Sequence, residues 1–77
     1  MKVEVLIFGQ LTDITGVSKI VIEDVRDTHQ FKERMHKLYP ALIDATYIIA
    51  VNKNIISENT FLENNSIIAM LPPFSGG

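Results

Sequence analysis

The first segment of the chain alternates hydrophobic with polar positions. Across residues 2–8, Val3, Val5 and Ile7 fall on one side of an extended chain, whereas Lys2 and Glu4 fall on the other. A two-residue period of this kind predicts a β-strand with one buried face. Leu6 and Phe8 share the side of Lys2, so the strand becomes apolar on both faces towards its end.

A second run of β-branched residues covers residues 18–25 and predicts a second strand. Between the two strands lies a segment bounded by Gly9 and Gly16, which we interpret as a turn region. The segment is longer than a two-residue hairpin loop, and its length is compatible with an antiparallel pair.

The period of the hydrophobic pattern then changes from two residues to a helical spacing. Between Thr28 and Tyr39 the apolar positions recur three and four residues apart, which predicts one buried stripe on an α-helix. These positions are Phe31, Met35, Leu38 and Tyr39. Asp27 or Thr28 can cap the start of the helix, and Pro40 ends it because proline disfavours helical geometry in the preceding residue.

Strand-like runs return in the last third of the chain. We expect strands at residues 47–52, 55–56 and 66–71, with a half-buried turn at residues 60–62. The order is then β-β-α-β-(β)-β, and one helix can cover only one face of a sheet. The sequence therefore predicts an α+β fold of the β-grasp type, in which a mixed sheet of four or five strands packs on one main helix.

Composition and charge narrow the classes of function. With 77 residues we expect a single domain, residues 1–77, and a hydrophobic fraction of 47% indicates a folded chain. The formal charge of −2 argues against nucleic-acid binding, and no apolar run is long enough for a membrane span. The absence of cysteine excludes disulfides and thiolate sites. The start of the chain lacks the pattern of a signal peptide, so we expect a cytoplasmic protein.

The most informative segment is residues 72–77, which read Pro72, Pro73, Phe74, Ser75, Gly76 and Gly77. Two prolines extend a chain, and two glycines leave it without side chains at its tip. Such a tail is thin enough to enter a narrow channel and carries a carboxylate that becomes reactive after adenylation. A Gly-Gly pair ends about 1 chain in 200 by chance, so the pair alone is a moderate signal.

Together these features resemble the small subunit of molybdopterin synthase, a ubiquitin-like sulfur carrier of the MoaD/ThiS type. The tail is similar to that family's P-P-V-[ST]-G-G ending, and residues 5–16 are similar to its L-F-F-A-x-[VL]-R-E-x-x-G opening. Ala50-Val51-Asn52 also matches. The chain departs from the family at Thr12-Asp13, at residues 63–66 and at Phe74.

The resemblance implies a function for the tail. An E1-like enzyme would adenylate the carboxylate of Gly77 with ATP, and a sulfur donor protein would convert it to a thiocarboxylate. The tail would enter the large catalytic subunit of molybdopterin synthase and donate sulfur to a cyclic pyranopterin phosphate, in molybdenum cofactor biosynthesis. The chain would bind no cofactor, would not be catalytic alone, and would form part of a heterotetramer.

Three other interpretations remain open at this point. The chain could be the sulfur carrier of thiamin thiazole synthesis, a ubiquitin-like modifier joined to lysines through Gly77, or a passive adaptor with an inert tail. The candidates for an apolar surface that contacts the partner are Phe8, Ile55, Leu71 and Phe74. His29, Glu33 and His36 share one helix face, but that face also carries Lys32, so we expect it to be solvated and not to hold a metal.

Overall fold

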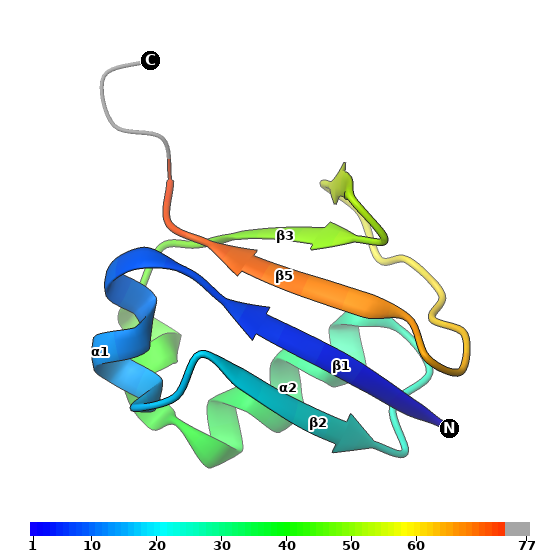
Figure 1. Cartoon of the computed structure of the whole chain (residues 1–77), viewed down its shortest axis with the longest axis horizontal. Helices are drawn as coiled ribbons and strands as arrows, with labels where there is room; N and C mark the ends of the chain where they lie inside the picture. Colours follow the sequence, from blue (N-terminus) through cyan, green and yellow to red (C-terminus); the bar gives the residue numbers. More distant parts are fainter. Residues whose placement is uncertain (74–77) are drawn as a thin grey trace.

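The computed structural model of this chain describes residues 1–73, which form a five-stranded sheet with helices on one side (Figure 1). In chain order the elements are β1 (Lys2–Ile7), η1 (Gly9–Leu11), α1 (Thr12–Thr15), β2 (Lys19–Glu23), α2 (Thr28–Leu38), η2 (Pro40–Asp44), β3 (Ile48–Val51), β4 (Asn54–Ile56) and β5 (Ile67–Leu71). None of the helices in residues 1–73 has the length and apolar composition needed to cross a bilayer.

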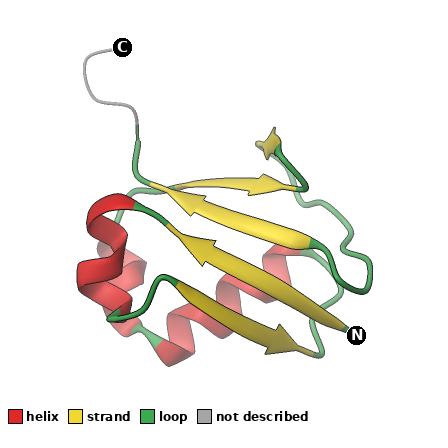
Figure 2. Cartoon of the chain, viewed as in Figure 1, coloured by secondary structure: helices red, strands yellow, loops and turns green. Residues whose placement is uncertain are grey.

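The strands lie in the order β2-β1-β5-β3-β4. β1 and β5 run parallel at the centre, and every other neighbouring pair is antiparallel. The helices cover one face, so the other face is open (Figure 2). The predicted ubiquitin-like β-grasp fold is therefore confirmed, with five strands in a mixed sheet.

The core lies between the sheet and α2. Alternate residues of β1 point into it, and Val3, Val5 and Ile7 are at most 3% exposed, as the two-residue period predicts. The central strand β5 adds two residues by the same alternation, Ile68 and Met70, both fully buried. The core face of β1 is thus assigned correctly from the sequence.

The helix α2 buries a narrower stripe than its pattern suggests. Phe31 and Met35 are fully buried, but Leu38, predicted to be part of the stripe, is 52% exposed. The reason is that α2 ends at Leu38 and the chain turns into η2, whose Leu42 is fully buried and fills the core instead. Tyr39 is half-buried against the core cluster.

The segment between Gly9 and Gly16 is helical, so its interpretation as a turn region is wrong. It forms η1 and the single-turn helix α1, which ends in a left-handed Gly16. Leu11 faces the core and is 3% exposed, which explains why the chain coils here: a helical turn places this side chain under the sheet and keeps the backbone hydrogen-bonded. β2 is also shorter than the predicted strand, because Asp24 adopts a left-handed conformation directly after it.

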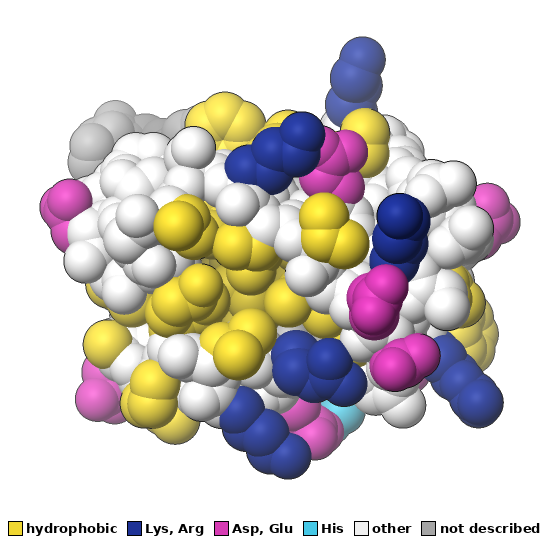
Figure 3. All heavy atoms as spheres, turned by 60° about the horizontal axis from the view of Figure 1, so that its bottom comes forward, with side chains coloured by type: hydrophobic (Ala, Val, Ile, Leu, Met, Phe, Trp, Pro, Cys, Tyr) yellow, Lys and Arg dark blue, Asp and Glu magenta, His cyan; other side chains and the backbone are white. Residues whose placement is uncertain are grey.

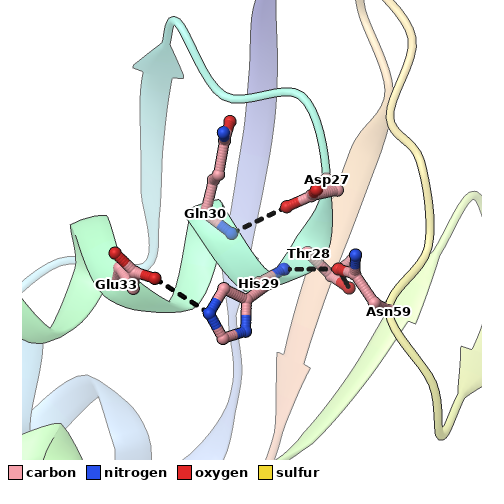
Figure 4. A network of polar contacts seen from close by, with 6 residues as sticks. All are labelled: Asp27, Thr28, His29, Gln30, Glu33 and Asn59. Carbon is pink, nitrogen blue, oxygen red and sulfur yellow. Dashed lines mark hydrogen bonds and ion pairs between the residues drawn. The ribbon is translucent and has the colours of Figure 1, made fainter.

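The start of α2 is tied to the loop after β4 by polar contacts (Figure 4). A carboxylate oxygen of Asp27 accepts a hydrogen bond from the backbone N–H of Gln30 at 2.8 Å, so of the two proposed caps Asp27 is the N-cap. The side-chain oxygen of Asn59 accepts from the His29 N–H at 2.8 Å and from the Thr28 hydroxyl at 3.2 Å. These bonds fix the loop against the helix.

The β3–β4 hairpin is closed by Asn52 and Lys53, which both have positive φ. Two such residues form the tight turn whose twist matches that of the flanking strands. The side-chain oxygen of Asn52 accepts from the N–H of Ile67 at 2.9 Å and so joins the hairpin to β5. This arrangement sets the position of β4 at the edge of the sheet.

Candidate functional site

The open face of the sheet carries a row of apolar side chains that crosses four strands. Strand register places Leu6 of β1 opposite Ala69 of β5, and Ala69 opposite Ala50 of β3. Ala50 in turn pairs with Ile55 of β4. Along β1, β5 and β3 these residues alternate with core residues, and Ile55 pairs with Ala50, so all of them share the face that the helices leave uncovered.

Of the four residues predicted to form the apolar surface, Phe8, Ile55 and Leu71 lie on this open face or at its end, and Phe74 lies outside the described residues. Phe8 continues β1 with an extended backbone and is 44% exposed, Ile55 is 61% exposed, and Leu71 is half-buried. Leu71 pairs with Ile48 of β3. Phe8 directly follows Ile7, the partner of Met70, and its N–H donates to the Met70 carbonyl at 3.0 Å. Their role in partner binding stays a prediction.

The tail begins at the end of the sheet where the two central strands, β1 and β5, finish. Because β1 and β5 are parallel, Phe8 and Leu71 lie at the same end of the sheet. Pro72 is half-buried there and Pro73 is exposed. The other tail residues, Phe74, Ser75, Gly76 and Gly77, lie outside the described residues. A tail that starts here leaves the sheet beside its open apolar face.

Two apolar residues of the open face were missed by the sequence analysis. Ile67 of β5 is 42% exposed and Val21 of β2 is 56% exposed. Both pair with Glu4, so they lie in the row next to that of Leu6. Strand parity was the available signal, since each residue is adjacent in sequence to a core residue, Ile68 or Ile22.

Charged residues border the apolar area. Glu4 and Lys19, on the adjacent strands β1 and β2, form an ion pair on the open face. Figure 3 brings the side of β2 and α2 forward and shows the open face obliquely; hydrophobic side chains gather in the middle of this view, with charged side chains of both signs around them. An apolar centre with a charged margin is the usual composition of a protein-binding surface.

The three residues considered for a metal site do not converge. Nε2 of His29 contacts a carboxylate oxygen of Glu33 at 2.9 Å, and both side chains are largely exposed (Figure 4). His36 is half-buried, contrary to the solvated position expected for it, and its Nε2 lies 2.8 Å from the hydroxyl of Tyr47. Burial raises the pKa of that hydroxyl above its usual value of 10.0. His36 thus joins α2 to the chain just before β3.

Comparison with solved structures places the fold among small carriers and modifiers. A complex of subunits 1 and 2 of molybdopterin-converting factor from Helicobacter pylori 26695 contains a chain 28% identical, with a TM-score of 0.78 over 100% of both chains. A protein assigned as molybdopterin converting factor subunit 1 from Pyrococcus furiosus is 22% identical, with a TM-score of 0.84 over 95% of this chain and 98% of that one.

Small archaeal modifier protein 1 from Methanosarcina acetivorans is also similar, at 24% identity and a TM-score of 0.84 over 99% of this chain and 96% of that one. The two likenesses below 25% identity concern the fold alone. The model of the ThiS family matches residues 5–77, which include the end of β1 and the tail. The chain therefore belongs to the ThiS family of ubiquitin-like sulfur carriers.

Proposed function

We propose that this chain is the sulfur-donating subunit of a molybdopterin synthase. In this proposal an E1-like enzyme uses ATP to adenylate the carboxylate of Gly77, with release of pyrophosphate. The outer sulfur of a persulfide on a sulfur donor protein then attacks the acyl carbon, and AMP leaves. A thiol cleaves the resulting acyl disulfide, which leaves a thiocarboxylate on the tail and a disulfide between that thiol and the donor sulfur. The large catalytic subunit accepts the tail and transfers its sulfur to a cyclic pyranopterin phosphate.

The observation that carries the proposal is the place where the Pro72–Gly77 segment starts. Pro72 directly follows the central strand β5, at the end of the sheet where the open apolar face also ends. A partner seated on that face would receive the tail without any change in the fold. The Helicobacter pylori structure is a complex of subunits 1 and 2, and its similar chain supports a large subunit as the partner of this one.

The residues of this chain have separate roles in the proposal. Phe8, Ile55 and Leu71 contribute contact area, because truncating buried aromatic or aliphatic anchors is what costs most at protein interfaces. Pro72 and Pro73 hold the first part of the tail extended. Gly76 leaves room for a narrow channel, and Gly77 supplies the carboxylate. Acid–base groups and anion-binding groups belong to the partners.

Intact mass spectrometry of the protein from its own cells tests the carrier chemistry. We expect a species ending at Gly77 and heavier by the difference between one sulfur and one oxygen atom, and its loss when the activating enzyme is deleted. The Gly77→Leu variant should not be converted, whereas its unfolding midpoint should equal that of the parent. A Gly77→Leu chain that is converted as fast as the parent would rule out a size-restricted tail.

A second candidate is a ubiquitin-like modifier, a class that shares this fold, as small archaeal modifier protein 1 does. It uses the same activated carboxylate but passes it to a lysine amine. A ladder of conjugates on an immunoblot would support it. The third candidate, a carrier for thiamin thiazole synthesis, is distinguished from the proposed function by its product. If the proposal is right, a reconstituted assay should yield the dithiolene pterin and no thiazole.

A further inference from the structure

Strand β2 lies at the edge of the sheet and leaves one of its sides free. It is the first strand in the order β2-β1-β5-β3-β4, so no other strand of residues 1–73 lies beyond it. The Ser18 carbonyl and the Asp24 N–H, which flank β2, both point towards β1 and are hydrogen-bonded there. In an antiparallel pair, the peptide groups of successive residues point to alternate sides. The N–H and C=O groups of Lys19, Val21 and Glu23 therefore point away from β1.

One of these outward groups already has a partner from outside the sheet. Nη1 of Arg34, on α2, donates to the Glu23 carbonyl at 2.9 Å. The bond agrees with the outward direction of this carbonyl. A backbone carbonyl has two lone pairs, so the Arg34 contact leaves room for a second donor. The free edge of β2 is thus open to hydrogen bonds from another chain.

The side chains in the middle of this edge strand are apolar. Val21 is 56% exposed on the open face, and Ile20 is half-buried against the core on the helix side. In Figure 3, which brings the side of β2 and α2 forward, hydrophobic side chains gather in the middle of the view. An edge strand with exposed apolar side chains is a template for pairing with another strand.

We propose that β2 pairs with β2 of a second copy of this chain, antiparallel and centred on Val21, so that one sheet continues through both copies. The strand reads Lys-Ile-Val-Ile-Glu over Lys19–Glu23, a pattern that complements itself when it is reversed. Lys19 of each copy lies opposite Glu23 of the other, and Ile20 lies opposite Ile22. Opposite charges that face each other across two strands stabilise the pairing.

The same register pairs the free backbone groups. It sets Val21 opposite Val21 and Lys19 opposite Glu23, so each residue with outward peptide groups faces another such residue and can exchange N–H···O bonds with it. The Lys19 ammonium contacts Glu4 of its own copy, but the Lys19 side chain is 61% exposed and can reach a second carboxylate. Both copies use the same surface, so the assembly closes at two chains.

The dimer leaves both tails accessible. β1 separates β5 from β2, and the two-fold axis reverses the strand direction, so the two Pro72 residues lie at opposite ends of the joined sheet. Self-association is therefore compatible with the proposed function and does not depend on it. A strand of five residues contributes a small interface, so we expect a weak dimer with a dissociation constant on the order of 100 µM.

Sedimentation equilibrium at concentrations on either side of that value tests the dimer. The average mass of the parent should rise from 8.7 kDa towards twice that mass. Lys19→Glu and Glu23→Lys each set like charges opposite one another at both ends of the pairing, so each should weaken association by at least about tenfold. An equimolar mixture of the two variants restores opposite charges and should associate again. The control is Lys53→Glu, which makes the same charge change in the β3–β4 hairpin and should dimerise like the parent.

Amide hydrogen exchange locates the contact. The Val21 N–H points away from β1, so its exchange should slow with concentration in the parent and not in Lys19→Glu. Val21→Pro removes this donor without removing a bond to β1, and should abolish association. A parent chain that keeps the mass of one copy at about ten times the expected dissociation constant overturns the inference. So does a dimer that Lys19→Glu leaves intact, because the copies then meet through another surface.

Discussion

The two ends of the sheet differ in what holds the chain in place. At the end where β1 and β5 begin, hydrogen bonds tie loops together: the Leu62 N–H donates to the Arg26 carbonyl at 2.7 Å, and the Asn65 N–H donates to the Lys2 carbonyl at 2.8 Å. At the end where β1 and β5 finish, Phe8 is 44% exposed and the tail starts. We call these the polar end and the tail end.

The difference indicates that stability and function are largely separated in space. Thr28 at the polar end is 2% exposed and has hydrogen-bond partners in two other residues, so its loss should weaken the fold. Phe8 at the tail end is 44% exposed, so its loss should remove little core and a large part of the contact area proposed for the partner. Substitutions at one end should therefore leave the property assigned to the other end unchanged.

The largest effect on stability is expected for Thr28→Val at the polar end. The change keeps the shape but leaves the Thr60 N–H, 3.0 Å from the Thr28 hydroxyl, without its acceptor. An unpaired polar group in a buried place costs about 1–3 kcal/mol. The control is Thr12→Val at the tail end, where the hydroxyl bond to Gly9 is exposed and its loss should cost less. Urea unfolding measures both, and equal losses would contradict the contrast between the ends.

On the open face, Ile55→Ala should weaken binding of the large subunit by about 1 kcal/mol or more and leave stability nearly unchanged. Ile55 is 61% exposed, so little of its area is part of the core. Ile43 in η2 is 62% exposed and offers the same substitution away from the sheet. Titration calorimetry with the large subunit compares the two variants, and the proposed surface would be refuted by equal affinities.

The sequence predicted the fold well because its apolar residues are regularly spaced in the segments that pack into the core. Val3, Val5 and Ile7 alternate without exception, and both faces of β1 follow from them. The spacing of apolar residues predicts burial wrongly where an element ends and the chain changes direction. Leu38 continues the helical stripe in sequence but lies on the last residue of α2, beyond the region that the sheet covers.

The candidate site was only partly predictable for a related reason. Phe8 and Leu71 could be placed on the open face from strand parity, but their proximity depends on β1 and β5 being parallel neighbours, although they lie at opposite ends of the sequence. A pattern within one segment carries no information on which distant segment lies beside it.

The N-cap of α2 gives a smaller, pH-dependent effect at the polar end. The Gln30 N–H, and to a lesser degree Asn59 and His29, hold the pKa of Asp27 below its usual value of 3.8. The folded chain then binds fewer protons than the unfolded chain, so this stabilisation is present above pH 3.8 and is lost as the pH falls through the folded pKa.

Asp27→Ala should lower the free energy of unfolding near neutral pH, because no side chain then accepts the hydrogen bond from the Gln30 N–H. Asp27→Asn retains an acceptor for the Gln30 N–H but does not titrate. The parent should therefore lose stability relative to Asp27→Asn as the pH falls below 3.8. A constant difference across this range would show that the carboxylate and the amide cap the helix equally in both charge states.

The smallest effect is expected from Tyr47, which brings a polar contact to the tail end on the helix side of the sheet. Its hydroxyl is half-buried beside His36, and burial raises its pKa above 10.0 because the phenolate would lose hydration. The neutral form is therefore favoured by folding, and this contribution to stability is complete below pH 10.0 and declines as the pH rises through the folded pKa.

Tyr47→Phe should be less stable than the parent below pH 10.0, by about 1 kcal/mol, because the bond to His36 is lost. Above pH 10.0 the free energy of unfolding of Tyr47→Phe should decline less steeply than that of the parent. Absorbance titration of the phenolate signal that Tyr47→Phe removes gives the pKa directly; a value at or below 10.0 would mean that this hydroxyl is solvated and that the tail end lacks this link between α2 and β3.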